Sequence, residues 1–323
     1  MIHRLPPGTR DVLPAEMREL RALSDRLRAS FDAAGYGEVW TPSVEYEDTL
    51  RRGDERAAGA GAYRLFDEHG RVLVLRSDMT VSIARLVATR YGGARPPVRL
   101  CYFAHSHRAV ERGRGHAREF LQGGIELIGP DAPEGDAEVV ALVLGALEEA
   151  GLRRHRIGVG DGSLVRELLG ELEVPHERRS ALLEHLSRRD LVALEADAEA
   201  IGLSPAAREL LVTIPSLRGG PEVLDRAGGP VARAVEGLRE LYELLAERAA
   251  ADRVILDLGL VRELGYYTGA VLEVYDPAVG YALGGGGRYD ELLGRFGTPL
   301  AACGIALDLQ RVHAAQAAEE RLG

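Results

Sequence analysis

Segments patterned like β-strands lie on both sides of one long helical block, and this order limits the folds open to the chain. Strand-like runs occur before the block at 38–40, 63–67, 71–75, 98–103 and 124–128, and after it at 253–258, 270–275 and 304–309. The block itself, 164–251, is rich in Leu, Glu, Arg and Ala. Because strands and helices do not alternate regularly, we predict an α+β fold, in which a helical insertion interrupts a mainly antiparallel sheet flanked by helices. The predicted core is 1–163 with 252–323, and the predicted insertion is 164–251.

Several segments outside the block have the periodicity of helices. In 17–34, apolar residues recur every three or four positions, and Gly35 follows as a stop signal. Residues 78–91 and 137–150 show the same pattern, and a final helix is expected after 304–309. The two strand-like runs within 63–75 flank a short turn and predict a hairpin.

The composition of the 323 residues narrows the class of protein. Hydrophobic residues make up 46% and charged residues 28%, which is typical of a globular chain and excludes disorder as its main state. The longest apolar run, 139–147, is about half of the ~20 residues that a membrane span needs. The start of the chain lacks the apolar block of a signal peptide. We therefore expect a cytoplasmic protein without membrane contact.

Charge and residue usage exclude further classes. The formal net charge of −10 argues against non-specific binding of nucleic acid, so tRNA is not an expected partner. All 40 basic residues are arginine, which excludes a P-loop lysine and a catalytic lysine. Cys101 and Cys303 lie in apolar runs and are expected to be buried thiols. His105, His107 and His116 have no further ligands at the usual spacing, so we expect neither a metal nor a cofactor.

A first polar cluster, LRSDMT at 75–80, lies where a predicted strand ends and a helix begins. Asp78 and Thr80 in this cluster are suited to hold the ammonium group of a ligand. The alternative is ordinary helix capping, because Ser or Asp before a helix accepts a backbone N–H bond. The residues alone leave both interpretations open.

A second cluster runs from Arg108 to Glu126. Its arginines and glycines predict a loop suited to a phosphate or carboxylate, because the guanidinium group binds planar anions through two parallel hydrogen bonds. Gln122 and Glu126 are four positions apart on a strand-like run and therefore point to the same face. The alternative interpretation is a solvated polar face.

Two later clusters complete the set. In LVRELGYYTG at 260–269, the neighbouring Tyr266 and Tyr267 fit one core and one surface position, because neighbours on a strand face opposite ways. The glycines at 284–287 are predicted to form a turn, and such a run is costly to order unless a ligand or another chain approaches the backbone. They are not a dinucleotide fingerprint, which requires a strand–turn–helix setting.

In this order, the clusters resemble the catalytic core of class II histidyl-tRNA synthetases over nearly the whole chain. PPGTRDVLP begins the match, GYGEVWTPSVEY is similar to the dimer-forming motif 1, and LRSDMT is similar to the synthetase L-R-P-E-x-T. The segment from HR to REFLQGGIE resembles motif 2, LVRELGYYTG and GGGGRYD resemble the two histidine-specific motifs, and GIALDLQR resembles motif 3. Seven ordered motifs make the resemblance specific.

The resemblance implies a fold, an assembly and a ligand. It implies an antiparallel sheet flanked by helices, a homodimer formed through motif 1, and a pocket for histidine. In that pocket Asp78 and Thr80 would lie near the amino group and Arg108 near the carboxylate. The other residues that it places around histidine are Gln122, Glu126, Arg262, Tyr266, Tyr267 and Tyr289, with Gly284, Gly285, Gly286 and Gly287 as a pocket loop.

Departures from the synthetase pattern change the expected function. The chain ends soon after Arg311, where a synthetase continues into an anticodon-binding domain. Val110 replaces a carboxylate expected to hold adenine, and Asp308 and Gln310 alter motif 3, where phosphates and magnesium bind. A core that keeps the amino-acid pocket and loses nucleotide contacts resembles the regulatory subunits of ATP phosphoribosyltransferase.

That second resemblance implies a regulatory protein without catalytic residues. It would join a short-form catalytic subunit in a hetero-oligomer, a hetero-octamer in that family. There it would activate the first step of histidine biosynthesis and mediate feedback inhibition by histidine. Two alternatives stay open: a truncated but active histidyl-tRNA synthetase, against which Val110, Asp308 and Gln310 argue, and a stand-alone histidine-binding protein with another partner.

Overall fold

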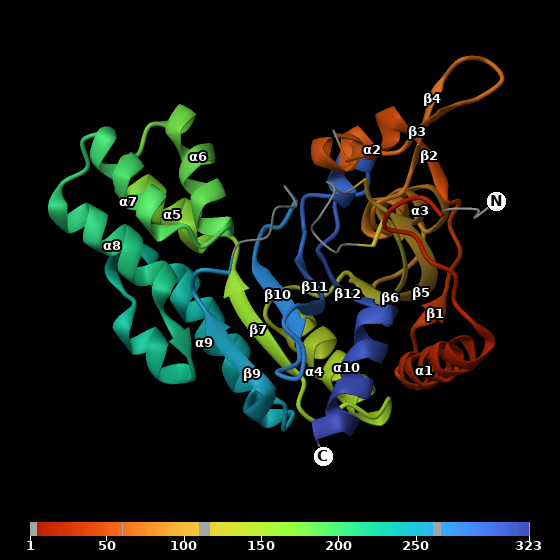
Figure 1. Cartoon of the computed structure of the whole chain (residues 1–323). Coiled ribbons are helices and arrows are strands. Elements are labelled where there is room, and N and C mark those ends of the chain that lie inside the picture. Colours follow the sequence, from red (N-terminus) through yellow and green to blue (C-terminus); the bar gives the residue numbers. More distant parts are fainter. Residues whose placement is uncertain (1–4, 60, 110–116, 261–265, 323) are drawn as a thin grey trace.

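The computed structural model describes residues 5–59, 61–109, 117–260 and 266–322 (Figure 1). Within these ranges the α-helices are α1 (Pro14–Ala33), α2 (Glu47–Gly53), α3 (Thr80–Arg90), α4 (Glu134–Glu149), α5 (Leu164–Glu171), α6 (His176–Ser187), α7 (Leu191–Ala200), α8 (Pro205–Ser216), α9 (Ala232–Glu247) and α10 (Leu309–Leu322). The strands are β1 (Gly37–Glu38), β2 (Val44–Tyr46), β3 (Arg64–Phe66), β4 (Val72–Leu75), β5 (Val98–His107), β6 (Glu119–Ile128), β7 (Arg156–Asp161), β8 (Arg218–Gly219), β9 (Val254–Asp257), β10 (Ala270–Tyr275), β11 (Ala282–Arg288) and β12 (Ala302–Asp308). Short 3-10 helices are η1 (Glu55–Ala58), η2 (Pro221–Arg226), η3 (Gly229–Val231), η4 (Ala251–Arg253) and η5 (Leu293–Phe296).

A nine-stranded sheet forms the centre of the fold, in the order β1-β5-β6-β12-β11-β10-β7-β9-β8. The β1–β5 and β7–β9 pairs are parallel, and the other neighbouring pairs are antiparallel. The predicted α+β fold, a mainly antiparallel sheet flanked by helices, is confirmed. Helices α1, α3, α4 and α10 confirm the four predicted outside the block, although α1 begins earlier than expected, with a proline in its first turn.

Strands β5 and β6 are longer than the sequence predicts, at ten residues each. The strand predicted here ends at Phe103, because the polar residues at 105–107 interrupt the apolar pattern of β5. In the structure the alternation continues with polar side chains, because His105 is exposed and Ser106 is buried. This extension places Ser106 against Gln122 of β6.

The prediction of a turn at 284–287 is wrong, because these glycines form the centre of β11. The neighbouring strand β12 leaves little room for side chains there. A Cβ at Gly284 would lie 2.2 Å from the carbonyl oxygen of Ala306, and one at Gly286 would lie 1.8 Å from that of Gly304. The run of glycines therefore does mark a close backbone approach, and the backbone that approaches belongs to the same sheet.

One face of the sheet packs against α1, α4, α9 and α10. Alternation along β5 divides the two faces: Cys101 lies in the hydrophobic core on this side, whereas Leu100 and Tyr102 lie in a second core on the other side. Cys303 of β12 belongs to the first core. Both cysteines are buried free thiols, as predicted.

The opposite face carries α2, α3 and a separate three-stranded sheet in the order β2-β4-β3. Strands β3 and β4 pair in antiparallel fashion, which confirms the predicted hairpin. This hairpin projects from the body of the molecule at the upper right of Figure 1. Side chains of α3 form the second core together with Tyr266, Tyr267 and Tyr289. The candidate site lies between this core and the middle strands of the large sheet.

The predicted helical block contains α5 to α9, and α5 to α8 form a group at the left of Figure 1. Apolar side chains such as Leu194 and Leu211 belong to the same hydrophobic core as the large sheet. Arg189 also donates to the buried Asp257 of β9 at 2.5 Å. The division into a core and an insertion stays a prediction. Within the described ranges, every helix is too short or too polar to span a membrane.

Candidate functional site

A cavity opens on the α3 side of the sheet, over β6, β11 and β12. Its volume of about 230 Å³ is below the roughly 300–1,000 Å³ of sites for drug-sized ligands, so it suits a ligand as small as an amino acid. The predicted site residues that line it are Asp78, Thr80, Arg108, Gln122, Glu126, Tyr266, Tyr267, Gly284, Gly285, Gly286 and Tyr289. Gly287 is not part of the lining, and Arg262 lies outside the described residues.

Glu126 of β6 lies at the inner end of the cavity, where its side chain is 1% exposed. Thr80 donates from Oγ1 to Glu126 Oε1 at 2.9 Å, and the Tyr102 hydroxyl reaches the same oxygen at 3.4 Å. The Tyr289 hydroxyl donates to the other oxygen, Oε2. Three hydroxyl groups, from α3, from β5 and from the residue after β11, therefore hold one buried carboxyl group.

The surroundings of Glu126 favour its neutral form. Burial raises the pKa of this carboxyl group to about 7, and the negative charge of Asp78 adds to the rise. The hydrogen bonds from Tyr289, Thr80 and Tyr102 oppose it. Near neutral pH the group is therefore close to its midpoint and can either accept or donate a hydrogen bond to a ligand.

Two glycines make room for this arrangement. Gly124 of β6 is opposite Tyr102, and a Cβ at Gly124 would lie 2.6 Å from the Tyr102 hydroxyl. Gly304 of β12 is opposite Glu126, and a Cβ there would lie 1.8 Å from Glu126 Oε2. The sequence-based prediction missed Tyr102 and Gly304. The signal is a small residue opposite a large one, which becomes visible only when the register between strands is known.

The position of Asp78 is compatible with both interpretations that the sequence leaves open. Its Oδ1 accepts a hydrogen bond from the backbone N–H of Thr80 at 3.1 Å, in the first turn of α3. The same side chain lines the cavity and is 6% exposed. Ser77 donates from Oγ to the other carboxylate oxygen, Oδ2, at 3.3 Å. A carboxylate held in this way can stabilise the helix start and still face a ligand ammonium group.

Gln122 and Arg108 add an amide and a cation to the lining. Gln122 and Glu126 face the same cavity, as the alternation along β6 predicts. Ser106 donates from Oγ to Gln122 Oε1 at 2.9 Å, which fixes the orientation of the amide. Arg108 donates from Nε to the carbonyl oxygen of Ser77 at 3.2 Å, and its guanidinium group lies 5.1 Å from the centre of the Phe120 ring. These contacts orient a cation suited to a carboxylate.

The expectation of one buried and one exposed tyrosine at 266 and 267 is wrong. Tyr266 is 2% exposed and Tyr267 is 9% exposed. Both precede β10, outside any strand, so two-residue alternation does not apply to them. Their ring centres lie 4.9 Å apart, and Tyr266 also meets Tyr289 edge-on at 5.9 Å. The three rings form an aromatic wall of the cavity.

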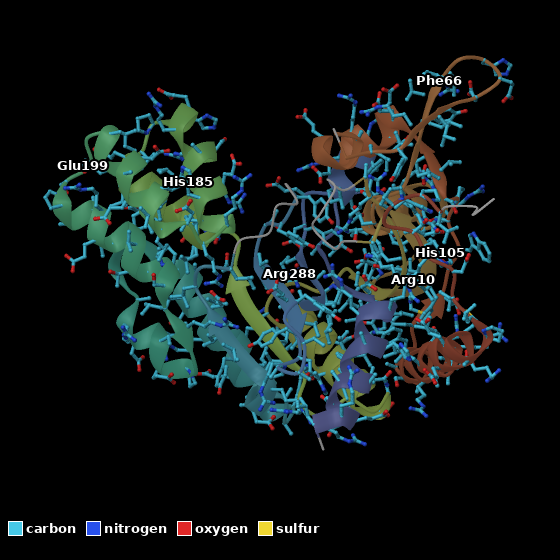
Figure 2. The ribbon with its side chains drawn as sticks, in the orientation of Figure 1. Arg10, Phe66, His105, His185, Glu199 and Arg288 are labelled. Carbon is cyan, nitrogen blue, oxygen red and sulfur yellow. The ribbon has the colours of Figure 1, made fainter. Side chains whose placement is uncertain are left out.

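The residue before Tyr289 anchors this wall to the other side of the sheet. Arg288, at the centre of Figure 2, is 2% exposed and lies 3.0 Å from the Asp136 carboxylate of α4. It also donates to Asp290 at 2.9 Å. Because Arg288 and Tyr289 are neighbours, the buried ion pair fixes the backbone that carries the Tyr289 hydroxyl.

The outer end of the cavity carries a pair of opposite charges that were not among the predicted site residues. Asp308 and Arg311 both line the cavity, and Arg311 Nε lies 3.3 Å from Asp308 Oδ2. Arg311 also donates to the carbonyl oxygen of Ala282 at 2.8 Å. Burial raises the pKa of Asp308, and backbone N–H groups of Gln310 and Arg311 donate to its carboxylate. The charge of Arg311 is therefore compensated within the chain.

The histidines do not gather into a metal site in the part of the chain that the structure describes. No group of three His, Cys, Asp or Glu side chains within it is placed to hold a metal ion. His107 faces Glu119 at 3.5 Å, and His105 is exposed. His116 lies outside the described ranges.

Comparison with known proteins identifies the family. The family model described as Histidyl-tRNA synthetase matches residues 8–312. The ATP phosphoribosyltransferase regulatory subunit of Desulforamulus reducens is 41% identical to this chain, over 96% of this chain and 78% of its own length. The protein of the same name from Symbiobacterium thermophilum is 42% identical, over 97% and 80%. This chain belongs to the family of ATP phosphoribosyltransferase regulatory subunits.

Solved structures place the fold of this regulatory subunit family among histidyl-tRNA synthetases. A Bacillus halodurans protein, described as an ATP phosphoribosyltransferase regulatory subunit/histidyl-tRNA synthetase, has a TM-score of 0.90 and 33% identity, and covers 98% of this chain and 84% of its own. A Nostoc histidyl-tRNA synthetase at 21% identity has a TM-score of 0.81 over 97% and 75%, and shows the fold alone. The predicted class II synthetase-like fold is confirmed. The names of the relatives also support the prediction of a regulatory subunit.

Proposed function

We propose that this chain binds free histidine in the cavity and thereby controls a short-form catalytic subunit of ATP phosphoribosyltransferase. It activates that subunit in the absence of histidine and inhibits it when histidine binds. The observation that carries the proposal is the buried Glu126, held by three hydroxyl groups inside a cavity of amino-acid size. A carboxyl group with its own donors at one end and an open cavity at the other is suited to a polar ring such as imidazole.

The other polar residues match the remaining groups of histidine. Asp78 and Thr80 suit the ammonium group, because a carboxylate and a hydroxyl both accept hydrogen bonds. Arg108 suits the carboxylate, through the paired N–H groups of its guanidinium. We assign Gln122, Tyr267 and Tyr289 to the space around the ring and the backbone of the ligand. Glycines 284–286 let the ligand lie directly against the backbone of β11.

The charges at the outer end argue against the alternative of an active synthetase. A nucleoside triphosphate is bound by cationic side chains that are not already paired with carboxylates of the protein. In this cavity Asp308 lies beside Arg311, and its carboxylate would repel a phosphate group. Histidyl-adenylate formation, measured as histidine-dependent exchange of pyrophosphate into ATP, is expected to be absent.

An apolar face on the small sheet supports the proposed homodimer through the motif 1 region. Because cross-strand partners point to the same side, the register places five apolar side chains on one face: Val44, Tyr46, Leu65, Leu73 and Leu75. Three of them are exposed, at 37% for Val44, 38% for Tyr46 and 44% for Leu65. The nearby Trp40 is 90% exposed, and Phe66 on the projecting hairpin is 73% exposed (Figure 2). An apolar face of this kind is typical of a surface covered by another chain.

Regulation requires that the catalytic subunit and histidine favour different arrangements of the assembly, which we expect to be a hetero-octamer. A coupling free energy of about 1–3 kcal/mol corresponds to a 5- to 150-fold response. Because coupling is reciprocal, the arrangement that activates the catalytic subunit must also bind histidine more weakly.

The test measures phosphoribosyl-ATP formation by the short catalytic subunit of the same organism, with and without this chain, across a histidine titration. We expect stimulation that histidine reverses. Glu126→Gln is the matched variant, and it should retain stimulation but lose the response to histidine. No stimulation and no complex would contradict the proposal. Histidine affinity without any effect on the transferase would favour a stand-alone histidine-binding protein.

A further inference from the structure

Arg76, between β4 and α3, is a buried arginine with unusual partners. Its side chain is 2% exposed. Nε donates to the carbonyl oxygen of His105 at 2.9 Å, and Nη1 donates to the carbonyl oxygens of Thr41 and Pro42, each at 2.8 Å. The Thr41 hydroxyl accepts a further bond from Nη1 at 3.3 Å. One guanidinium group thus joins two segments that are far apart in the sequence.

These partners are neutral. In the described part of the chain, no carboxylate oxygen lies within hydrogen-bonding distance of Arg76, whereas the equally buried Arg288 is paired with Asp136. The carboxylate of Glu45 acts on Arg76 through space but does not bond to it. Burying a charge without a directly bonded counter-ion is costly unless hydrogen bonds satisfy it. The carbonyl groups satisfy Arg76 only while both segments stay in place, so the cost of its burial opposes any movement of one segment relative to the other.

Arg76 is linked to the cavity by its own chain neighbours and by the His105 segment. Asp78 lies two positions after Arg76 in the chain. The His105 branch adjoins Ser106, whose hydroxyl orients Gln122. The backbone carbonyl of Arg76 accepts the N–H of His107, and Arg108 donates to the carbonyl of Ser77.

The opposite side of Arg76 leads to the apolar face of the small sheet. Thr41 and Pro42 connect the exposed Trp40 to Val44 of β2. The backbone N–H of Arg76 also donates to the carbonyl oxygen of Ser43 at 3.0 Å. A chain that covers the apolar face would therefore lie next to the segment 41–42, to which Arg76 is bonded.

We propose that Arg76 is a positioning residue that sets the place of Asp78, Gln122 and Arg108 and couples them to the apolar face of the small sheet. Its role in ligand binding rests on the proposed function, with histidine as the ligand. Arg76 touches no ligand itself, because it is not part of the cavity lining. Its effect reaches the ligand through the three residues that it places.

The first test compares Arg76→Lys with wild type and with Arg85→Lys as the matched control. Arg85 braces the same sheet through Glu45 of β2 and does not line the cavity. A lysine keeps the charge of Arg76 but cannot reach both segments at once. Calorimetric titration should show that Arg76→Lys binds histidine at least about tenfold more weakly, the size of one lost charge-assisted hydrogen bond. The preference for histidine over histamine, which lacks the carboxylate, should fall as well, because Arg108 is displaced.

The second test changes Thr41, a hydrogen-bond partner of Arg76 on the side away from the cavity. Thr41 is 1% exposed and not in the cavity lining. Thr41→Val removes its hydroxyl, which accepts from Arg76 Nη1 at 3.3 Å and donates to Met79 Sδ at 3.8 Å. This variant should weaken histidine binding a few-fold, and should add nothing further in the Arg76→Lys background. If Arg76→Lys does not fold, Thr41→Val decides the proposal by itself.

Hydrogen exchange measured without ligand separates the two proposals. Arg76→Lys should speed exchange at 77–80 and 105–108, and Arg85→Lys should not. A wild-type chain that binds no histidine overturns the proposed function, while exchange still decides the role of Arg76. Unchanged exchange at both segments, or unchanged affinities for histidine and histamine in a wild-type chain that binds, overturns the role given to Arg76.

Discussion

The two ends of the cavity are built from different chemistry. At the inner end, Glu126 is contacted by the hydroxyl groups of Thr80, Tyr102 and Tyr289. At the outer end, Asp308 and Arg311 compensate each other. The inner end therefore keeps a buried group that gains from a polar ligand, whereas at the outer end the carboxylate of Asp308 already pairs with Arg311. Ligand recognition is expected to depend mainly on the inner end.

The largest effect is expected from Glu126→Gln, which breaks the inner end directly. The amide keeps the shape of the side chain but removes the charge-assisted hydrogen bonds to a bound imidazole. At about 1.5–3 kcal/mol for one such bond, histidine affinity should fall roughly 10- to 150-fold. Calorimetry measures this loss. Glu273→Gln, in another lining residue, is the control and should change the affinity little.

Next in size is a pH effect on stability that arises from the same group. The folded-state pKa of Glu126, about 7, lies above its ordinary value of 4.5, so the folded chain binds a proton that the unfolded chain has released. Its contribution to stability is fully present below about pH 4.5 and is lost as the pH rises to about 7. At 1.36 kcal/mol per pKa unit, the full change is about 3 kcal/mol.

Urea denaturation at several pH values checks this effect, with Glu126→Gln as the reference. Other carboxyl groups titrate in the same range, so the informative quantity is the difference between wild type and variant. Wild type should lose stability relative to the variant between pH 4.5 and 7. Parallel curves of unfolding free energy against pH for the two proteins would contradict this prediction, because they would show that burial does not raise the pKa of Glu126.

Gly304→Ala tests how closely the inner end is packed. The new Cβ would meet Glu126 Oε2 at 1.8 Å and the carbonyl oxygen of Ile125 at 2.5 Å. Overpacking of this kind costs about 1–3 kcal/mol, and it should weaken histidine binding by moving the carboxyl group. The control is Gly145→Ala in α4, where nothing lies within 4 Å. That substitution should leave the stability unchanged or raise it. The melting temperatures of the two variants, measured by thermal unfolding, check this difference.

The smallest effect is expected at the outer end. Asp308→Asn removes the charge that faces Arg311, so affinity for inorganic pyrophosphate should rise by about tenfold at low salt. Histidine affinity should stay within about twofold of wild type. The gain should vanish in the double variant with Arg311→Gln. A large loss of histidine binding in Asp308→Asn would contradict the separation of the two ends.

Most of the sheet could be predicted because its strands alternate apolar and polar residues or lie between clear turns. Strands β2 and β7 were not predicted. The prediction also failed where polar residues continue a strand, as at 105–107, and where a strand has no side chains, as at 284–287. Composition alone marks both segments as loops. Their place in the sheet is set by hydrogen bonds to neighbouring strands that come from distant parts of the sequence.

The candidate site was predictable only in part. The resemblance to the synthetase motifs implied side chains that the structure places in the cavity lining, such as Asp78, Gln122 and Glu126. It missed Tyr102 and Gly304, because their roles depend on which residues are opposite them in the sheet. It also missed the ion pair at the outer end, since burial and distance decide whether two charges compensate each other.

The glycine strand β11 also limits how this site can change over evolutionary time. Gly284, Gly285 and Gly286 offer a ligand only backbone atoms, and a side chain at Gly284 or Gly286 would collide with β12. Binding sites usually acquire new specificity through substitution of the side chains that line them. Along this wall of the cavity, such substitutions would collide with β12. A descendant of this protein that recognised a different ligand would have to change β6, the tyrosines or the start of α3 instead.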